Sequence, residues 1–435
     1  MAAERFVVLG LAPARSGWFR SVGVWANSGA LPAEFVRCIS AEEVRARLAS
    51  GRPFSALVAD AGLPAVDRDL VAAARGAGCA VLVVDDGRAT RDWPALGAAR
   101  VLGPSFTRDE LVTALVACAR TIRRSEAPAA ELLARPIAPQ WRGTVVAVTG
   151  PGGTGASTTA MALAQSLGDD VRAAGLVLLA DLRLHAEQAM LHDVRDVAPG
   201  MQELVEAHRG GQPSCEAARG LCFMVPERGY HLLLGIRQAR FWPALRPQAF
   251  EAAFDTLCRA YRTVVCDVDP DFEGEDACGS IDVEERNVMA RTSTTRADAV
   301  LAVGNSSLKG VHSLVRVITA LVNHGVDPER IVPVLNRTSR SPRARATLGT
   351  ALAELVRPVT QGRLASPIHL PERDIDADLH DGRRLPAALG DPLAGALAAV
   401  LARAEDRLLP TPSGAGERVR PGSLGAWDGG EEAAI

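Results

Sequence analysis

The sequence VVAVTGPGGTGASTTA, residues 145–160, decides the fold of the chain around it. A β-branched run opens it, a turn rich in glycine and proline follows from Gly150 to Gly155, and an alanine- and leucine-rich helical pattern begins at Ala156. This order of strand, turn and helix predicts an anion site, because the amides at a helix start point outward and the helix dipole adds partial positive charge.

The turn fits the Walker A pattern at every position but one. Gly150, Gly155 and Ser157 stand where the pattern has its two glycines and its Mg²⁺-binding hydroxyl. Ala156 stands where the pattern has the lysine that bridges the β- and γ-phosphates. The chain has one lysine, Lys309, among many arginines, but a drift from lysine to arginine would have kept a charge at position 156. The sequence therefore predicts a nucleotide pocket without its main cation.

Length and composition exclude several classes of protein. With 435 residues, 48% of them apolar, the chain can bury a large core and form two or three domains. A net charge of −3 does not suit a nucleic-acid-binding protein, so we expect no direct contact with nucleic acid. The eight cysteines lack CxxC spacing, which argues against metal or disulfide frameworks. No apolar run resembles a signal peptide or reaches the ~18–20 residues of a membrane helix. We therefore expect a cytoplasmic protein that reaches membranes only through partners.

Residues 1–122 alternate predicted strands with helical patterns. This alternation predicts an α/β domain with a parallel sheet covered on both faces. The clearest helices are expected over Ala41–Leu48 and Arg108–Arg120. The strands are expected near Phe6–Leu11, Phe35–Ile39, Ser55–Asp60, Ala80–Val84 and Arg100–Leu102.

Two strings in this domain resemble the receiver domain of two-component signalling. Asp60, with Pro64 four residues on, stands where that family has its phosphoacceptor, and Gly103–Phe106 stands where it has Lys-Pro-x-Phe. Leu9–Leu11 replaces the acidic residues that hold Mg²⁺ in the family, and Gly103 replaces its lysine. We therefore interpret Asp60 as a turn residue rather than a phosphoacceptor, and this flavodoxin-like domain as a pseudoreceiver that provides a docking surface.

A linker and a tail are predicted on either side of a second α/β domain over residues 143–408. Prolines and charges over 123–142 predict the linker, and residues 409–435 have too few apolar residues to fold. The final helix carries an apolar stripe that we interpret as core packing rather than as membrane-targeting, because a basic opposite face is missing. The expected strands are Leu176–Ala180, Cys222–Val225, His231–Leu234, Thr263–Cys266, Ala299–Gly304 and Ile331–Leu335, and the expected helices are Thr158–Leu167, Met201–Ala207, Phe250–Ala260, His312–Asn323 and Pro392–Arg407.

Five stretches of the second domain occur in a recognisable order. They are Gly150–Thr158, Asp181 after the next strand, Val264–Asp267, Val334–Arg337, and Leu370–Asp374 leading to Asp381-Gly382. In this order they resemble the MinD/ParA superfamily of deviant-Walker ATPases, and more narrowly its CpaE/TadZ-like branch, which often carries a receiver-like N-terminal domain. The likeness is closest to actinobacterial septum site-determining proteins of the Ssd type. It implies a parallel-sheet P-loop domain and a homodimer.

The resemblance implies a role for each matched residue, with ATP and Mg²⁺ as cofactors. Ser157 would give an oxygen to Mg²⁺, and Asp181 and Asp267 would lie at the metal, because hard oxygen ligands suit Mg²⁺. The alternative for Asp267 is a helix or turn cap. Asn336 would contact adenine with Arg337 beside it, and Pro371 would flank the base. The phosphates would lie against Gly150, Gly152, Gly153, Thr154, Gly155, Ala156, Ser157 and Thr158.

Three departures from the superfamily concern catalysis. Pro151 replaces the signature lysine and lacks a backbone N–H, Ala156 replaces the Walker A lysine, and Arg183 replaces the second switch-I carboxylate. Two lost charge-assisted contacts of roughly 1.5–3 kcal/mol each correspond to about two to four decades of binding or rate. We therefore expect a pseudo-ATPase, and its catalytic residues stay unassigned. Arg183, Arg337 and Lys309 could restore charge, although Lys309 is expected in a solvated loop.

The resemblance implies a spatial organiser that influences septum placement and cell division, with protein partners at the septum. One alternative is a CpaE/TadZ-like factor that places tight-adherence pilus secretion machinery at a pole. A second alternative is a slow but genuine ATPase. A third, a signalling response regulator, is disfavoured because no helix-turn-helix output or basic patch is visible.

Overall fold

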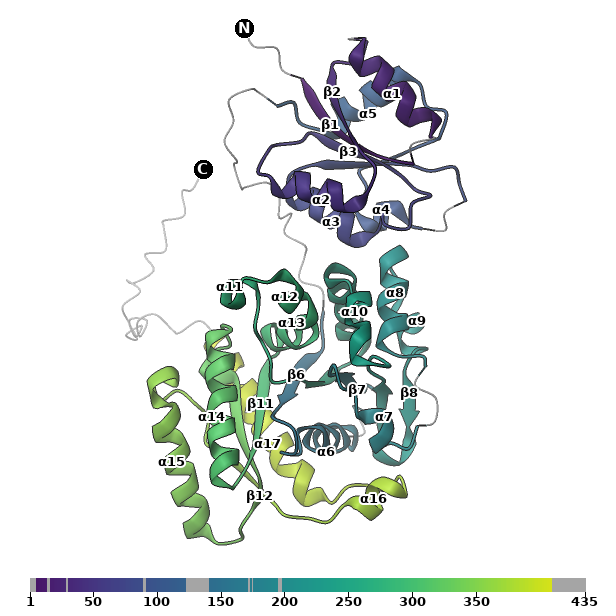
Figure 1. The fold of residues 1–435 in the computed structure, drawn as a ribbon. Coiled ribbons are helices and arrows are strands. Elements are labelled where there is room, and N and C mark those ends of the chain that lie inside the picture. The colour runs from purple at the N-terminus through teal and green to yellow at the C-terminus, as the bar shows by residue number, and fades with distance from the viewer. Residues whose placement is uncertain are drawn as a thin grey trace, which may run out of the picture.

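The computed structural model describes residues 5–13, 16–28, 30–88, 91–122, 141–170, 173, 175–194 and 198–408. The tail expected over 409–435 and all but the last two residues of the expected linker lie outside the described residues. The described chain forms two sheets with helices on both faces of each, as Figure 1 shows. The predicted α/β class is confirmed.

The first sheet has five parallel strands in the order β2-β1-β3-β4-β5, which is the flavodoxin-like order. Helices α1 and α5 pack on one face, and α2, α3 and α4 pack on the other. The strands are β1 (Phe6–Leu11), β2 (Ala33–Cys38), β3 (Ala56–Asp60), β4 (Ala80–Val84) and β5 (Arg100–Leu102), and the helices are α1 (Gly17–Asn27), α2 (Ala41–Ala49), α3 (Arg68–Gly76), α4 (Trp93–Leu96) and α5 (Arg108–Cys118).

The second sheet has eight strands in the order β13-β12-β11-β6-β10-β7-β9-β8, and only β8 runs antiparallel to its neighbour. Helices α6 and α17 cover one face, while α8, α10, α13 and α14 cover the other. The strands are β6 (Thr144–Thr149), β7 (Val177–Leu182), β8 (Phe223–Val225), β9 (Tyr230–Leu233), β10 (Thr263–Val268), β11 (Ala299–Asn305), β12 (Ile331–Thr338) and β13 (Ile368–Pro371). The helices are α6 (Ala156–Gly168), α7 (Gln188–Leu191), α8 (Met201–Gly210), α9 (Cys215–Arg219), α10 (Pro247–Ala260), α11 (Glu275–Cys278), α12 (Ile281–Arg286), α13 (Val288–Arg296), α14 (Leu308–Asn323), α15 (Pro342–Thr360), α16 (Asp376–His380) and α17 (Ala387–Leu408), with short 3₁₀ turns at Pro226–Arg228, Ala239–Ala244 and Pro328–Arg330.

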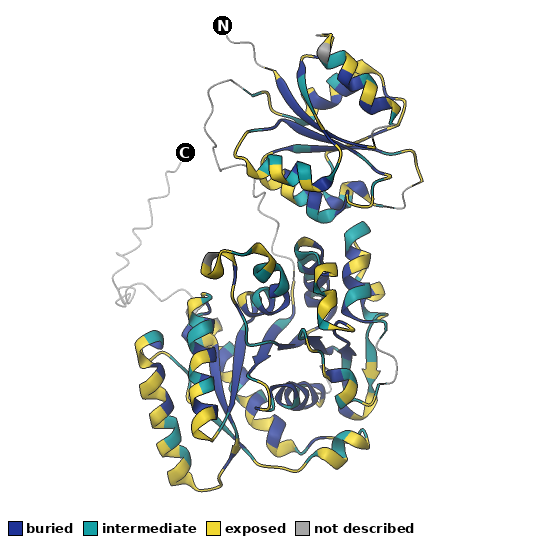
Figure 2. Ribbon diagram, in the orientation of Figure 1, coloured by how far each residue is buried: buried dark blue, intermediate teal, exposed yellow. Residues whose placement is uncertain are grey.

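Burial explains why these segments are strands. The central strands are continuous apolar runs that are buried on both faces, as in most parallel sheets (Figure 2). Helix α17 alone among the described helices is long and apolar enough to cross a membrane by composition. Its residues Leu389, Leu393 and Leu397 are buried in the core shared with α6, which confirms the core packing predicted for this stripe.

Several predicted boundaries are wrong, for local reasons. Strand β7 continues through Asp181 and Leu182, and α17 begins at Ala387 rather than Pro392. Helix α14 begins four residues earlier than predicted, because the Ser307 hydroxyl accepts a hydrogen bond from the amide of Gly310. Lys309 therefore lies in the first turn of a helix, exposed, and not in a loop. Helix α15 and strand β13 were not predicted, since α15 buries few of its side chains and gives a weak apolar pattern.

Helix α3 of the first domain contacts α8 and α10 of the second (Figure 1). Arg68 donates from Nε to the His208 carbonyl (2.8 Å) and from Nη2 to the Gly211 carbonyl (2.7 Å), at the C-terminal end of α8. The next residue, Asp69, accepts a hydrogen bond at Oδ1 from the backbone amide of Gln248 in the first turn of α10 (3.1 Å). Two adjacent residues of α3 thus place a cation at one helix C-terminus and an anion at one helix N-terminus, each where the dipole favours it.

This contact makes the stability of the protein depend on pH through Asp69. Burial raises the pKa of Asp69 to about 6, and its Oδ2 atom is buried without a hydrogen-bond partner. A carboxyl whose pKa is raised by folding costs stability as the pH rises from its unfolded pKa of about 3.9 to the folded value. We therefore expect the free energy of unfolding of Asp69→Asn to rise relative to that of wild type between about pH 4 and pH 6. Above that window the difference between the two proteins should stay constant. Urea unfolding of both proteins at several pH values measures this difference, and a difference independent of pH would contradict it.

Candidate functional site

The receiver-like domain holds Asp60 in a turn with both carboxylate oxygens engaged. Oδ1 accepts a hydrogen bond from the Gly62 amide (3.0 Å), and Oδ2 accepts one from the indole Nε1 of Trp18 on α1 (3.1 Å). The neighbouring end of β1 is Leu9–Leu11, which offers no carboxylate for a metal. The geometry fits the interpretation of Asp60 as a turn residue.

We expect Asp60 to stay unmodified when the full-length protein is incubated with acetyl phosphate and Mg²⁺. The indole of Trp18 contacts the oxygen that a phosphoryl group would need, and no carboxylate of β1 can hold the metal. Intact-protein mass spectrometry checks this expectation. A gain of one phosphoryl group that disappears in Asp60→Asn would contradict it.

The glycine-rich turn lies between β6 and α6 and is open on its outer side. Gly153 and Gly155 have φ angles of +77° and +84°, which glycine adopts without strain. A Cβ atom added at Gly152 or Gly153 would meet no atom within 4 Å. The first-turn amides of α6 have no acceptor within the helix, because its first bond runs from the amide of Thr159 to Gly155. The turn therefore suits a phosphate anion through its backbone alone.

Side chains on two sides brace this turn. The Thr154 hydroxyl donates to the Pro151 carbonyl (2.7 Å), and Asn336 donates from Nδ2 to the Thr154 carbonyl (2.9 Å). The Asn336 Oδ1 atom accepts from the amide of Arg337, which has a left-handed φ of 54°. Asn336, expected at adenine, thus holds the phosphate-type loop in this structure. Pro371, expected beside the base, ends strand β13.

The carboxylates expected at the metal lie side by side on neighbouring strands. Asp181 of β7 and Asp267 of β10 are in register, and both are fully buried. Ser157 lies in the first turn of α6, close enough to Asp267 that its hydroxyl lowers the pKa of that carboxyl. The structure therefore brings the three predicted metal residues together, beneath the start of α6.

A guanidinium group also lies in this cluster. Arg183 is 11% exposed, and its Nη1 atom is 3.3 Å from Oδ1 of Asp267. Its Nη2 atom is 3.5 Å from Oδ1 of Asp269, the residue that directly follows strand β10. Gln188 donates from Nε2 to Oδ2 of Asp267 (2.8 Å) and to the Ser157 carbonyl (3.3 Å). Both oxygens of Asp267 are therefore bound by protein donors.

Burial and neighbouring charge set the protonation of these groups. Burial raises the pKa of Asp181, and the negative charge of Asp267 raises it further. Burial also raises the pKa of Asp267, against the opposing effect of Arg183. Burial alone would lower the pKa of Arg183, but Asp267 and Asp269 outweigh it and raise the value. Arg183 therefore stays charged, and the cluster already contains its own cation.

The residues present do not fit a Mg²⁺ ion. The metal needs near-octahedral oxygen ligands at about 2.0–2.1 Å, whereas the Asp181 carboxylate accepts from the amides of Gln188 (2.9 Å) and Arg183 (3.3 Å). The buried oxygens left without a partner near the cluster are neutral ones, Oγ1 of Thr149 and Oε1 of Gln188. Among the described residues, no group of three or more histidine, cysteine or acidic side chains is suited to hold a metal ion.

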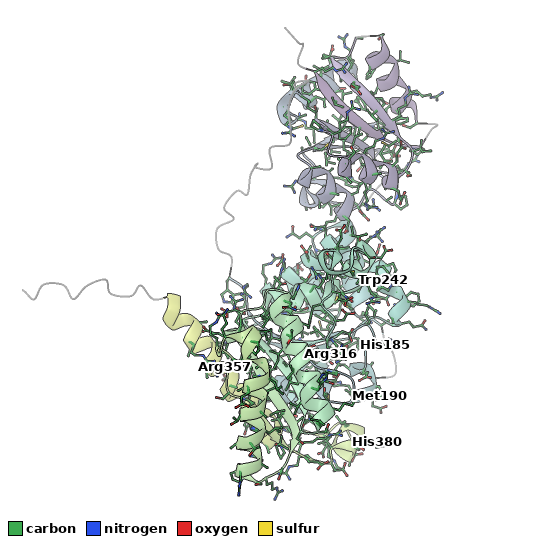
Figure 3. All side chains as sticks on the ribbon, turned by 60° about the vertical axis from the view of Figure 1, so that its left-hand side comes forward. His185, Met190, Trp242, Arg316, Arg357 and His380 are labelled. Atoms are coloured by element: carbon green, nitrogen blue, oxygen red, sulfur yellow. The ribbon has the colours of Figure 1, made fainter. Side chains whose placement is uncertain are left out.

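Two residues of this cluster were missed by sequence reasoning. Asp269 follows Asp267 by two positions, so the alternation Asp-Val-Asp at a strand end was an available signal. Gln188 gave no signal, because only the turn after β7 brings it inward. Figure 3 labels its neighbours His185 and Met190, which are exposed while Gln188 is buried.

The sequence matches no protein-family model and no curated protein. Solved structures match parts of the chain at low identity and low TM-score. A ParA-family ATPase from Chlorobium tepidum TLS is 15% identical with a TM-score of 0.44, and the match covers 59% of this chain and 98% of that one. The septum site-determining protein MinD from Pyrococcus horikoshii OT3, complexed with Mg-ADP, is 20% identical with a TM-score of 0.40, covering 61% and 96%. A response regulator receiver protein from Pseudomonas putida is 20% identical with a TM-score of 0.22, covering 27% and 99%. At these values the matches say nothing about what this chain binds.

Proposed function

We propose that this protein is a MinD/ParA-type spatial organiser that keeps a phosphate-binding loop but does not hydrolyse ATP productively. It would influence septum placement and cell division as a cytoplasmic homodimer that recruits protein partners of the division septum. The observation that carries the proposal is the contrast within one site. The backbone of the loop is formed, while Pro151, Ala156 and Arg183 stand at the positions where the resembled family has its catalytic groups.

The chemistry of phosphoryl transfer explains why a loop can bind phosphate and still fail to catalyse its transfer. Turnover needs positive charge at the γ-phosphate and an oriented water, and it is almost entirely electrostatic and positional. Here α6 supplies only the partial charge of a helix N-terminus, Ala156 is 4% exposed beneath the loop, and Arg183 is paired with two carboxylates. The loop can therefore attract an anion without lowering the barrier to its cleavage.

The nucleotide implied by the resemblance is ATP, and the loop offers a place for its phosphates at Gly152, Gly153 and Ser157. Asn336 would donate a hydrogen bond to adenine through its second side-chain N–H, because the bond to the Thr154 carbonyl uses only one of its two amide donors. The first domain would act as a docking surface through faces other than α3, which already contacts the second domain.

The full-length protein is expected to release no phosphate from ATP above background in Mg²⁺, and Ser157→Ala is expected to remove nothing further. A coupled phosphate-release assay measures both. Mg²⁺-dependent turnover that Asp267→Ala abolishes would establish a working ATPase and reject the proposal.

In cells, depletion of the protein is expected to displace septa, and the Asp60→Ala protein is expected to localise as wild type does.

Two alternatives make different predictions. A CpaE/TadZ-like factor would localise to a pole with pilus secretion machinery, and a secretion ATPase encoded beside it would favour that role. A slow ATPase would need another arginine in place of the lost lysine. Arg316, labelled in Figure 3, lines with Pro151 a cleft of 610 Å³, so turnover lost in Arg316→Ala would support this second alternative.

A further inference from the structure

We propose that Arg183 is the permanent cation of this P-loop site, so that any phosphate ligand of the loop binds free of divalent metal. The ligand class is a nucleoside di- or triphosphate without Mg²⁺. The inference rests on the proposed function only in assuming that the loop binds phosphate. Its metal-binding test does not depend on that assumption.

The position of the guanidinium carries the proposal. Its Nη1 atom contacts Oδ1 of the Asp267 carboxylate (3.3 Å), whose Oδ2 atom accepts from Gln188 (2.8 Å), and the Ser157 hydroxyl lies close by. Asp267 and Ser157 are the two side chains that would hold a metal between α6 and β10. A divalent ion placed there would share its carboxylate ligand with a group that is already positively charged. Arg183 thus already neutralises the negative charge of Asp267 and occupies its Oδ1 atom, both of which a metal ion would need.

The backbone holds this arginine in place from both sides. The Arg183 amide donates to Oδ1 of Asp181 (3.3 Å), and the amide of the next residue, Leu184, donates to Oδ2 of Asp269 (2.7 Å). Asp269 therefore binds both the guanidinium and the backbone of the segment that carries it. Rotating the guanidinium away to admit a metal would break its contacts with both Asp267 and Asp269, although the backbone bonds would remain.

The first experiment titrates the full-length protein with Mn²⁺ alone and detects bound ion by electron paramagnetic resonance. Wild type is expected to show no Mn²⁺ site in this cluster, whereas Arg183→Ala is expected to gain one, with an affinity about tenfold or more above the background binding that wild type shows. Arg384→Ala is the matched control, because Arg384 pairs with Asp169 at the opposite end of α6. Mn²⁺ binding by wild type that is lost in Asp267→Asn would overturn the proposal, and this outcome needs no arginine variant to fold.

The second experiment measures binding of a fluorescent ADP analogue in Mg²⁺ and in EDTA. Wild-type affinity is expected to change by less than about twofold, and Arg183→Ala is expected to bind about tenfold tighter with Mg²⁺ than without it. Wild-type binding that requires Mg²⁺ would overturn the inference but not the proposed function, which needs a loop that binds phosphate without productive turnover and makes no demand on the metal. If neither protein binds the analogue, the Mn²⁺ titration alone decides whether Arg183 excludes a divalent metal from the cluster.

Discussion

Arg183→Ala is expected to lower the free energy of unfolding by about 3 kcal/mol or more. The arginine is 11% exposed, and its removal leaves the buried carboxylate of Asp267 and the nearby Asp269 without a counter-charge. Urea unfolding followed by circular dichroism measures the loss. Arg384→Ala, which breaks an exposed ion pair, is expected to cost about 1 kcal/mol or less.

The loss should depend on pH with a definite sign. Without the guanidinium, the pKa of Asp267 moves further above its unfolded value of about 3.9. A raised pKa contributes stability at low pH that is lost as the pH rises through the folded value. The variant is therefore expected to lie closest to wild type at acid pH and to fall behind it as the pH rises. Adding Asp267→Asn to Arg183→Ala should recover part of the stability at neutral pH. A loss that is the same at every pH would argue that the arginine acts only through packing.

Ala156→Lys is expected to tighten nucleotide binding by about 10- to 100-fold, since one charge-assisted contact to phosphate contributes roughly 1.5–3 kcal/mol. Position 156 is the first residue of α6, directly after the left-handed Gly155, so a lysine there starts from the place that Walker A prescribes. Adding Pro151→Lys should tighten binding again, because it supplies both a charge and a backbone N–H. Calorimetry with ADP measures both steps.

The matched control for this prediction is Ala156→Arg. It restores a charge at the same position with a planar fork that does not follow the lysine path around the phosphates, so a smaller gain is expected. Equal affinity of wild type and Ala156→Lys would show that the loop is closed to nucleotide for a reason other than charge. If Arg183 replaces the metal, Ala156→Lys should still bind ADP equally well in EDTA.

Much of this fold could be predicted from local sequence. The apolar runs identified the central strands within a few residues, and the spacing of Gly150, Gly155 and Ser157 placed the loop correctly between a strand and a helix. Both features depend on neighbours in the chain, which a sequence displays directly. Helix α14 shows the limit, because its start depends on one hydroxyl cap at Ser307.

The contacts between residues of the candidate site could not be predicted from local sequence. Arg183 meets Asp267 only because β7 and β10 are adjacent in the sheet, and the order of strands is not written in either segment. Asn336 reaches the loop from a strand 182 positions away along the chain. Sequence reasoning could therefore name these residues and count their charges, but it could not show that Arg183 pairs with the carboxylates that were expected to hold a metal.

The capping of α8 and α10 by Arg68 and Asp69 has a consequence for how this protein can be dissected. The first half supplies hydrogen-bond partners to the ends of two helices that belong to the second. A fragment that starts after residue 140 would present a bare carbonyl end and a bare amide end to water. A foreign receiver joined to the P-loop half would restore these two caps only if it brought an Arg-Asp pair to the same place.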